Sequence, residues 1–262
     1  SFAVKELCRS MSAPTSRDDE ALKRLSRYLL GRPRMVMEFV WQEPMPITVY
    51  TDSDWAGCLT TRKSTSGGAL MRGTHLLRHW SATQPTIALS SAEAELAAIV
   101  RGASEALGMR SLMRDLHRDT TVQIWADASA AIGIVRRSGV GRVRHLDTRM
   151  LWIQQKVREG DLQLGKVDGQ VNPADLFTKP LPTEAISEHC FRMSCACRTG
   201  RAATAPDVAT RVLLGAPASM NAAPGGVIEQ AAYRCQFCLK LYVFVKQNTL
   251  RPISHLARNQ SI

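Results

Sequence analysis

The order of expected strands and helices limits the fold of this chain more than any other feature. Between residues 47 and 182, three strands come first, and strands then alternate with helices. The expected strands cover residues 47–52, 67–72, 76–82, 121–126 and 162–167. The expected helices cover residues 91–107, 109–117, 128–137, 147–159 and 173–178, with Gly108 as a break between the first two. The order βββαβαβα predicts an α/β fold in which helices pack against a mixed sheet.

Four acidic residues lie where an expected strand ends or an expected helix begins. They are Asp52, Glu95, Asp127 and Asp175. Local folding does not need an acid at all four places. A pair of divalent cations about 3.5 to 4 Å apart, in contrast, needs several hard oxygen ligands that converge from separate elements. The four acids therefore predict the site of a two-metal phosphodiesterase.

Two of these positions have a neighbouring acid that competes for the same role. Asp52 and Asp54 lie on one face of the expected strand, although the DxD pattern also fits a solvated turn. We prefer Asp52 as the ligand. Ser90 to Glu93 fits a capping box, which gives Glu93 the structural task of closing the helix start. Glu95 is therefore the preferred ligand of that pair.

The other two acids have helix-capping alternatives. Asp127 ends a strand just before a helix, where an N-cap aspartate is common, although Ser129 offers an alternative cap. Asp175 is the third residue after Asn172, where an acid also suits the start of a short helix that begins at Pro173.

Six sequence blocks around these acids look like successive blocks of one known domain. In chain order they are TDSDWAG, RKSTSGG, HWSATQPTIALSSAEAELAAI, IWADASAAI, VRHLDTRMLWIQQKVREG and NPADLFTKPLP. They resemble the ribonuclease H domain in the Pol polyprotein of copia-type retrotransposons, from about Ile47 to about Pro182. The preceding segment, ALKRLSRYLLGRPRMVMEFVWQ, is similar to the helix and strand that close the reverse transcriptase of that family.

The resemblance implies a ribonuclease H-like fold and hydrolysis of the RNA strand of RNA–DNA hybrids. It also implies two Mg²⁺ ions, with Mn²⁺ as a substitute, because all expected ligands are hard oxygens. Asp52 would bridge both ions, Asp175 would hold the ion on the side of the attacking water, and Glu95 and Asp127 would hold the ion at the leaving group. The implied partners are the hybrid and the upstream reverse transcriptase part of the same polyprotein.

A second set of residues is predicted to bind nucleic acid. Two basic loops suit phosphate contacts, which position a duplex without choosing its sequence, although each also fits a solvated surface. Gln170 stands in a loop where many ribonucleases H carry a histidine that this chain lacks. The full set is Arg62, Lys63, Ser64, Thr65, Ser66, Arg142, Arg144, His145 and Gln170. Trp55 and Trp80 are predicted to pack in the core or against the sheet rather than to stack on bases.

Composition agrees with a partner of negative charge. The chain of 262 residues has a formal net charge of +11 and an isoelectric point near 9.7. Seven scattered cysteines favour a reducing compartment, so we expect an intracellular protein, in a cytoplasmic particle or the nucleus. Neither a signal peptide nor an apolar run of membrane-spanning length is present, so we expect no membrane partner.

The sequence divides into three predicted regions. Residues 1–44 are expected to be the end of a reverse transcriptase, with a helix over 17–31, and residues 45–182 the ribonuclease H domain. Residues 183–262 are unassigned and expected to be largely disordered, because much of this region is rich in Ala, Pro and Gly. Within that last region, Cys235 and Cys238 form a lone CxxC, which is a weak zinc signal. The chain begins at Ser1 in mid-pattern, and we expect it to be a piece of a longer polyprotein.

Two other functions remain open from the sequence. A degenerate element would leave a silent domain that binds nucleic acid without cutting it, but the four intact acids argue against this. An integrase-like nuclease of the same fold is the other alternative, and the RKSTSG and NPADLFTK blocks favour ribonuclease H.

Overall fold

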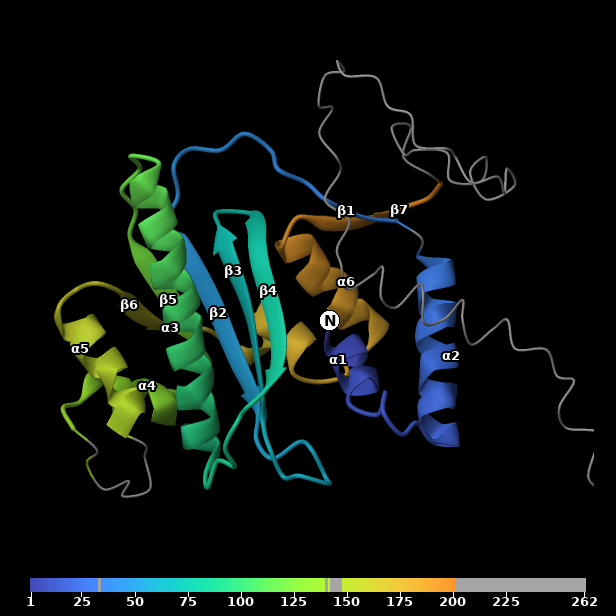
Figure 1. Ribbon diagram of the computed structural model, residues 1–262. Coiled ribbons are helices and arrows are strands. Elements are labelled where there is room, and N and C mark those ends of the chain that lie inside the picture. Colours follow the sequence, from blue (N-terminus) through green and yellow to red (C-terminus); the bar gives the residue numbers. More distant parts are fainter. Residues whose placement is uncertain (33, 140, 142–147, 201–262) are drawn as a thin grey trace, which may run out of the picture. The chain divides into compact units, whose positions relative to one another are not determined.

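A five-stranded sheet forms the centre of the computed structural model, which describes residues 1–32, 34–139, 141 and 148–200 (Figure 1). The strand order is β4-β3-β2-β5-β6. The strands β2, β3 and β4 pair antiparallel in that order, while β5 pairs parallel with both β2 and β6. The bounds are β2 Ile47–Asp54, β3 Thr65–Arg72, β4 His75–Thr83, β5 Val122–Ala126 and β6 Gln163–Lys166. The predicted mixed sheet is confirmed.

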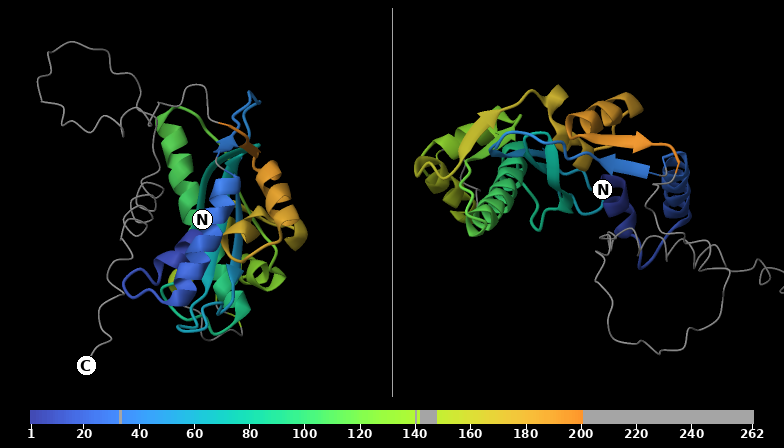
Figure 2. Two further views of the ribbon diagram at one scale, coloured as in Figure 1. Left: turned by 90° about the vertical axis from the view of Figure 1, so that its right-hand side faces the viewer. Right: turned by 90° about the horizontal axis from the view of Figure 1, so that it is seen from above.

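Helices cover both faces of the sheet, as the view from above shows (Figure 2). On one face, α3 (Ser91–Asp115) packs against β2, β3 and β5. The same face carries α4 (Ser129–Arg136) and α5 (Trp152–Arg158). A 3-10 turn, η1 (Thr148–Leu151), comes directly before α5. The other face carries two further 3-10 turns, η2 (Gly169–Val171) and η3 (Pro173–Phe177), and then α6 (Thr183–Arg192). Side chains of β3 alternate between two cores: Leu70 joins the α3 side, and Met71 joins the side of η3 and α6.

The large core lies between the sheet and α3. Its fully buried members include Ile47, Val49, Leu96, Ile99 and Ile124. Gly102 lets α3 approach β2, because a Cβ at this position would lie only 2.5 Å from Cγ2 of Thr51. The close approach holds the start of α3 beside the end of β2, where two of the predicted metal ligands lie.

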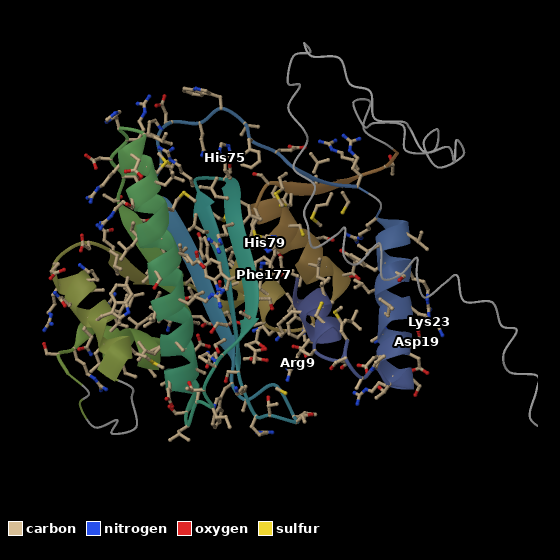
Figure 3. All side chains as sticks on the ribbon, in the orientation of Figure 1. Arg9, Asp19, Lys23, His75, His79 and Phe177 are labelled. Atoms are coloured by element: carbon tan, nitrogen blue, oxygen red, sulfur yellow. The ribbon has the colours of Figure 1, made fainter. Side chains whose placement is uncertain are left out.

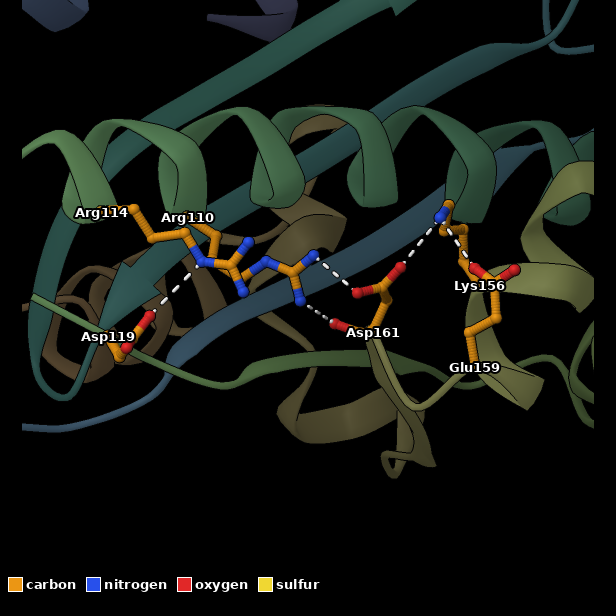
Figure 4. A network of polar contacts seen from close by, with 6 residues as sticks. All are labelled: Arg110, Arg114, Asp119, Lys156, Glu159 and Asp161. Atoms are coloured by element: carbon orange, nitrogen blue, oxygen red, sulfur yellow. Dashed lines mark hydrogen bonds and ion pairs between the residues drawn. The ribbon is translucent and has the colours of Figure 1, made fainter.

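The predicted break at Gly108 is wrong, because α3 is continuous from Ser91 to Asp115. A glycine inside a helix costs about 1 kcal/mol relative to alanine, which packing of the rest of the helix offsets. A polar network holds the far end of α3 (Figure 4). Arg110 donates to the carbonyl and the carboxylate of Asp161, and Lys156 contacts both Asp161 and Glu159. This network joins α3 to the turn between α5 and β6.

The segments outside the predicted ribonuclease H region also contribute structure. The chain starts with α1 (Phe2–Cys8) and α2 (Ser16–Gly31), and β1 (Arg34–Met37) pairs antiparallel with β7 (Cys195–Arg198). Residues 183–198 therefore form α6 and β7, so this part of the predicted last region, 183–262, is ordered rather than disordered. The rings of His79 on β4 and Phe177 stack with centroids 5.1 Å apart, which ties η3 to the same face (Figure 3). Cys235 and Cys238 lie outside the described residues.

Candidate active site

Parallel pairing brings Asp52 and Asp127 to the same edge of the sheet. Asp52 is buried near the end of β2, and Asp127 directly follows the last residue of β5. The two strands are in register with Thr51 opposite Ala126. Because the carboxyl ends of parallel neighbours meet at one edge, the residues that follow this pair lie next to each other. The edge is where α/β proteins usually place their functional groups.

Glu95 reaches the same edge from the first turns of α3. Ser90 Oγ accepts the backbone N–H of Glu93 at 3.2 Å, and Glu93 Oε2 accepts the N–H of Leu89 at 2.7 Å. These bonds use the Glu93 carboxylate to close the helix start. Glu95 Oε1 instead accepts the N–H of Ser53 at 3.2 Å. Carboxylate oxygens of Asp52, Glu95 and Asp127 lie within 4.8 Å of one another.

Asp175 lies on η3, which packs against β3 at Gly67, and it is not one of the three acids whose oxygens lie within 4.8 Å of one another. A Cβ at Gly67 would lie 2.6 Å from Cγ2 of Thr178 and 2.9 Å from Cβ of Phe177, so only glycine leaves room for this turn. Asn172 caps the turn by accepting the N–H of Ala174 at 3.1 Å. Its amide also donates to the carbonyl of Thr51 at 3.0 Å.

Two residues that follow Asp175 join it to Asp52. The hydroxyl of Thr178 donates to Asp52 Oδ2. Lys179 Nζ lies 2.9 Å from Asp175 Oδ1 and 4.0 Å from Asp52 Oδ2. The ammonium group therefore lies between the two carboxylates and offsets part of their repulsion. Asn172, Thr178 and Lys179 were not among the predicted site residues, although all three belong to the NPADLFTKPLP block.

The carboxylates lie close together in a site that is largely shielded from water. Burial, followed by the charges of Asp52 and Asp127, raises the pKa of Glu95 to about 9. Burial and the charge of Asp52 raise the pKa of Asp175 to about 6, and the same two causes raise the pKa of Asp127. Glu95 Oε2 is buried and finds no hydrogen-bond partner among the described residues. Such a set favours a bound cation, because a divalent ion would satisfy the oxygen and relieve the repulsion.

The donor set fits Mg²⁺ or Mn²⁺ rather than a softer metal. Among the described residues that could ligate here, the cluster contains carboxylates and neither cysteine nor histidine. An open hollow lies beside Asp127 and is lined by Lys166, Val167, Asp168 and Gly169. Through this hollow, Asp127 is accessible from solvent.

The structure distinguishes Asp54 and Asp127 by their local contacts. Asp54 accepts the N–H of Thr65 and belongs to the turn between β2 and β3, which agrees with the preference for Asp52. The helix α4 begins without a side-chain cap at Ala128, so neither Asp127 nor Ser129 caps it. Asp127 is therefore not used as a cap.

The predicted nucleic-acid residues of the first basic loop differ in exposure. Ser64, Thr65 and Ser66 are buried, and their hydroxyls accept from Ala56 N–H, Lys5 Nζ and Gln84 Nε2, respectively. These three were predicted to face nucleic acid, but their hydroxyls are used to hold the β2–β3 turn. Arg62 is exposed and Lys63 is half-buried, so these two remain available at the surface.

The other predicted nucleic-acid residues are Gln170, Arg142, Arg144 and His145. Gln170 is exposed on η2, and its backbone N–H donates to Asp168 at 2.9 Å. Arg142, Arg144 and His145 lie outside the described residues.

The two tryptophans near the cluster behave differently. Trp80 is buried against Gly68, which confirms the predicted packing role. Trp55 is 54% exposed, and its indole N–H donates to the carbonyl of Ala88 at 3.1 Å. Of the two predicted kinds of packing, core packing is wrong for Trp55, because this hydrogen bond holds the ring at the surface.

Comparison with known proteins places the chain in a family. It is 31% identical over 183 residues to the retrovirus-related Pol polyprotein from transposon TNT 1-94 of Nicotiana tabacum, a match covering 69% of this chain and 14% of that protein. It is 30% identical over 196 residues to the corresponding polyprotein from transposon RE1 of Arabidopsis thaliana. This match covers 74% of this chain and 13% of that protein. The chain belongs to the copia-type, retrovirus-related Pol polyproteins. It spans about a seventh of the length of these Pol polyproteins.

Within the Pol polyprotein, the matched part has an α/β fold built on a five-stranded mixed sheet. No protein-family model matches the chain. A solved structure of LC11-RNase H1, isolated from compost, is similar with 20% identity and a TM-score of 0.37, covering 54% of this chain and 95% of that protein. The same enzyme in complex with an RNA/DNA hybrid gives 17% identity and a TM-score of 0.36. This match covers 50% of this chain and 93% of that protein. In the described part of the Pol chain, no helix combines the length and apolar character needed to span a membrane.

Proposed function

We propose that this Pol fragment hydrolyses the RNA strand of RNA–DNA hybrids with two divalent metal ions, as part of retrotransposon reverse transcription. The convergence of Asp52, Glu95 and Asp127 within 4.8 Å carries the proposal. Asp175 extends this group, because Lys179 links its carboxylate to that of Asp52. A nuclease of this fold is supported by the family, and the two-metal mechanism is the further step.

The four carboxylates would hold the ions, with Mg²⁺ as the expected metal. When bound, such ions lower the pKa of a coordinated water and neutralise charge on the phosphate and the departing 3′ oxygen. No protein nucleophile is then needed, and the chain's own groups position the acids. Thr178 orients Asp52, Ser53 orients Glu95, and Asn172 fixes the turn that carries Asp175.

The hybrid would be held mainly through its backbone. Arg62 and Lys63 lie on the loop after β2 and offer phosphate contacts, and Arg142, Arg144 and His145 are proposed to do the same. Choice of the RNA strand would rest on its 2′-hydroxyl groups and on groove shape. The upstream reverse transcriptase part of the polyprotein is the proposed protein partner.

A cleavage assay with matched duplexes tests this proposal. The chain should cut the labelled RNA strand of a hybrid in Mg²⁺ or Mn²⁺, leave double-stranded DNA of the same sequence intact, and stop in excess EDTA. Asp52→Asn is the matched variant, because it keeps the shape of the side chain while removing its charge. Cleavage that persists in EDTA or in Asp52→Asn would contradict the metal mechanism. Hybrid binding without cleavage by the unaltered chain would indicate the silent domain instead.

A further inference from the structure

Trp55 presents an aromatic ring to solvent from a loop that is held firmly on both sides. The ring is 54% exposed, and its N–H bond to the Ala88 carbonyl fixes its edge. Asp54, just before it, accepts the N–H of Thr65. Ala56, just after it, has a left-handed φ of 54° and donates its N–H to Ser64 Oγ at 2.9 Å. An L-residue rarely adopts that backbone, so the loop is held in place by its contacts.

Exposed apolar residues flank the carbonyl that anchors this ring. Ile87 and Leu89 stand on either side of Ala88, and both side chains are exposed. Leu89 is itself fixed, because its N–H donates to the carboxylate of Glu93. We call Trp55, Ile87 and Leu89 the apolar shelf. Large apolar side chains on well-fixed backbone indicate a surface that meets a partner.

The apolar shelf lies next to the acid cluster along two independent connections. Trp55 follows Asp52 by three residues and lies in the turn after β2, so its Cα is at most roughly 10 Å from that of Asp52. That length corresponds to about three base-pair rises of ~3.4 Å. On the other side, Leu89 bonds to Glu93, which precedes Glu95 by two residues on α3. A strand whose phosphate meets the acid cluster would therefore pass over the shelf within a few nucleotides.

Nucleic acid supplies the chemistry that fits both regions. A nucleotide strand alternates charged phosphates with sugar and base units that have apolar faces, and exposed Arg62 belongs to the same loop as Trp55. We propose that Trp55 packs against a sugar and base edge of the hybrid, two or three nucleotides from the phosphate held at the acid cluster. This contact rests on the proposed function, since it needs a hybrid bound at that cluster. The sugar part of this contact tolerates any sequence, because every nucleotide of a strand carries the same sugar.

Tryptophan emission and hybrid affinity test the contact together. The chain carries five tryptophans, and Asp52→Asn is included in every protein so that no substrate is cut. Adding hybrid should quench the emission of the Asp52→Asn parent, and Trp55→Phe should remove most of that quenching. Trp55→Ala should weaken binding of a labelled hybrid, measured by anisotropy, roughly tenfold, which corresponds to about 1.4 kcal/mol. Trp55→Phe, which keeps an aromatic ring, should lose less than about threefold in affinity.

Trp41 provides a matched control, because it is 83% exposed but lies between β1 and β2 in the chain, away from the acids. Trp41→Phe should keep the quenching, and Trp41→Ala should bind hybrid like the parent. If Trp55→Ala binds equally well and Trp55→Phe keeps the quenching, Trp55 does not touch the hybrid, and the proposed function still stands. If the parent binds no hybrid at all, the proposed function fails along with the contact. If Trp55→Ala instead converts an oligomer to monomer in sedimentation, the shelf joins copies of the chain, which overturns the proposal.

Discussion

The side-chain amide of Asn172 donates to the backbone carbonyl of Thr51 at 3.0 Å, across 121 positions of the sequence. Thr51 immediately precedes Asp52, and Asn172 caps the turn that carries Asp175. One buried amide therefore ties together the two segments that supply these acids. The bond stabilises the edge of the sheet and sets where the fourth carboxylate lies.

Replacing Asn172 should damage both stability and activity. Asn172→Ala removes two hydrogen bonds from a fully buried side chain and leaves the Thr51 carbonyl and the Ala174 N–H without this partner. Unpaired buried groups cost about 1–3 kcal/mol each, so the free energy of unfolding should fall by roughly 2–6 kcal/mol. Urea denaturation measures the loss. Gln170→Ala, at an exposed nearby position, should change it by less than about 0.5 kcal/mol. Equal stability for the two variants would show that the Asn172 contact is unimportant.

Substitutions at Glu93 and Glu95 should have different effects, on stability at Glu93 and on activity at Glu95. Glu93→Gln weakens an acceptor at the helix start, and the expected cost is at most about 1 kcal/mol, with most of the activity retained. Glu95→Gln should abolish hybrid cleavage with the fold intact, because it removes a predicted metal ligand. Cleavage rates and thermal unfolding of both variants give the comparison. The reverse pattern would mean that Glu93 is the ligand.

Glu95 should also make the metal-free protein sensitive to pH. Its pKa in the folded chain is raised from 4.5 to about 9, chiefly by burial. A carboxyl group whose pKa is raised by folding stabilises the folded protein fully at a pH below its pKa in the unfolded chain. This stabilisation is lost as the pH rises through its pKa in the folded chain. Unfolding in EDTA should therefore show stability that falls between pH 4.5 and 9. Glu95→Gln should make the free energy of unfolding less dependent on pH. At pH 8 the variant should be more stable than the parent by on the order of 1–3 kcal/mol. A slope identical in both proteins would assign the effect to other groups.

Lys179 should act as the counter-charge of Asp52 and Asp175 when metal is absent. Lys179→Met should lower the melting temperature in EDTA by about 1–3 °C, because the two carboxylates then repel each other without their ammonium neighbour. Added Mg²⁺ should raise the melting temperature of this variant more than that of the parent. Lys23→Met changes the net charge equally at an exposed pair with Asp19, and it should leave the Mg²⁺ effect unchanged. Equal Mg²⁺ effects in the Lys179 and Lys23 variants would contradict this role.

The main elements of the sheet followed from the sequence because their local patterns are strong. Alternation from Ile47 onward indicated β2, and the two parallel strands fell within one or two residues of their observed bounds. The helix start at Ser90 was equally clear, because its capping pattern depends on neighbouring residues alone. Such features need no knowledge of what packs against them.

Features that depend on distant contacts were missed or misjudged. Gly108 looked like a helix break because its packing context was unknown. Trp55 was expected in the core or against the sheet, although the Ala88 carbonyl holds it at the surface. Pairing of β7 with β1 joins residues about 160 positions apart, which no local pattern reveals. Lys179 could be related to Asp52 only after η3 had been placed against β3.

Counting the metal ions bound with substrate tests the central claim most directly. The chain is mixed with a hybrid whose RNA strand carries 2′-O-methyl groups and resists cleavage, and bound Mn²⁺ is measured by electron paramagnetic resonance. Two Mn²⁺ per chain should bind in the presence of the hybrid, and Asp52→Asn should bind fewer. Two ions that remain bound in Asp52→Asn, or none bound by the unaltered chain, would contradict a two-metal site built from Asp52, Glu95, Asp127 and Asp175.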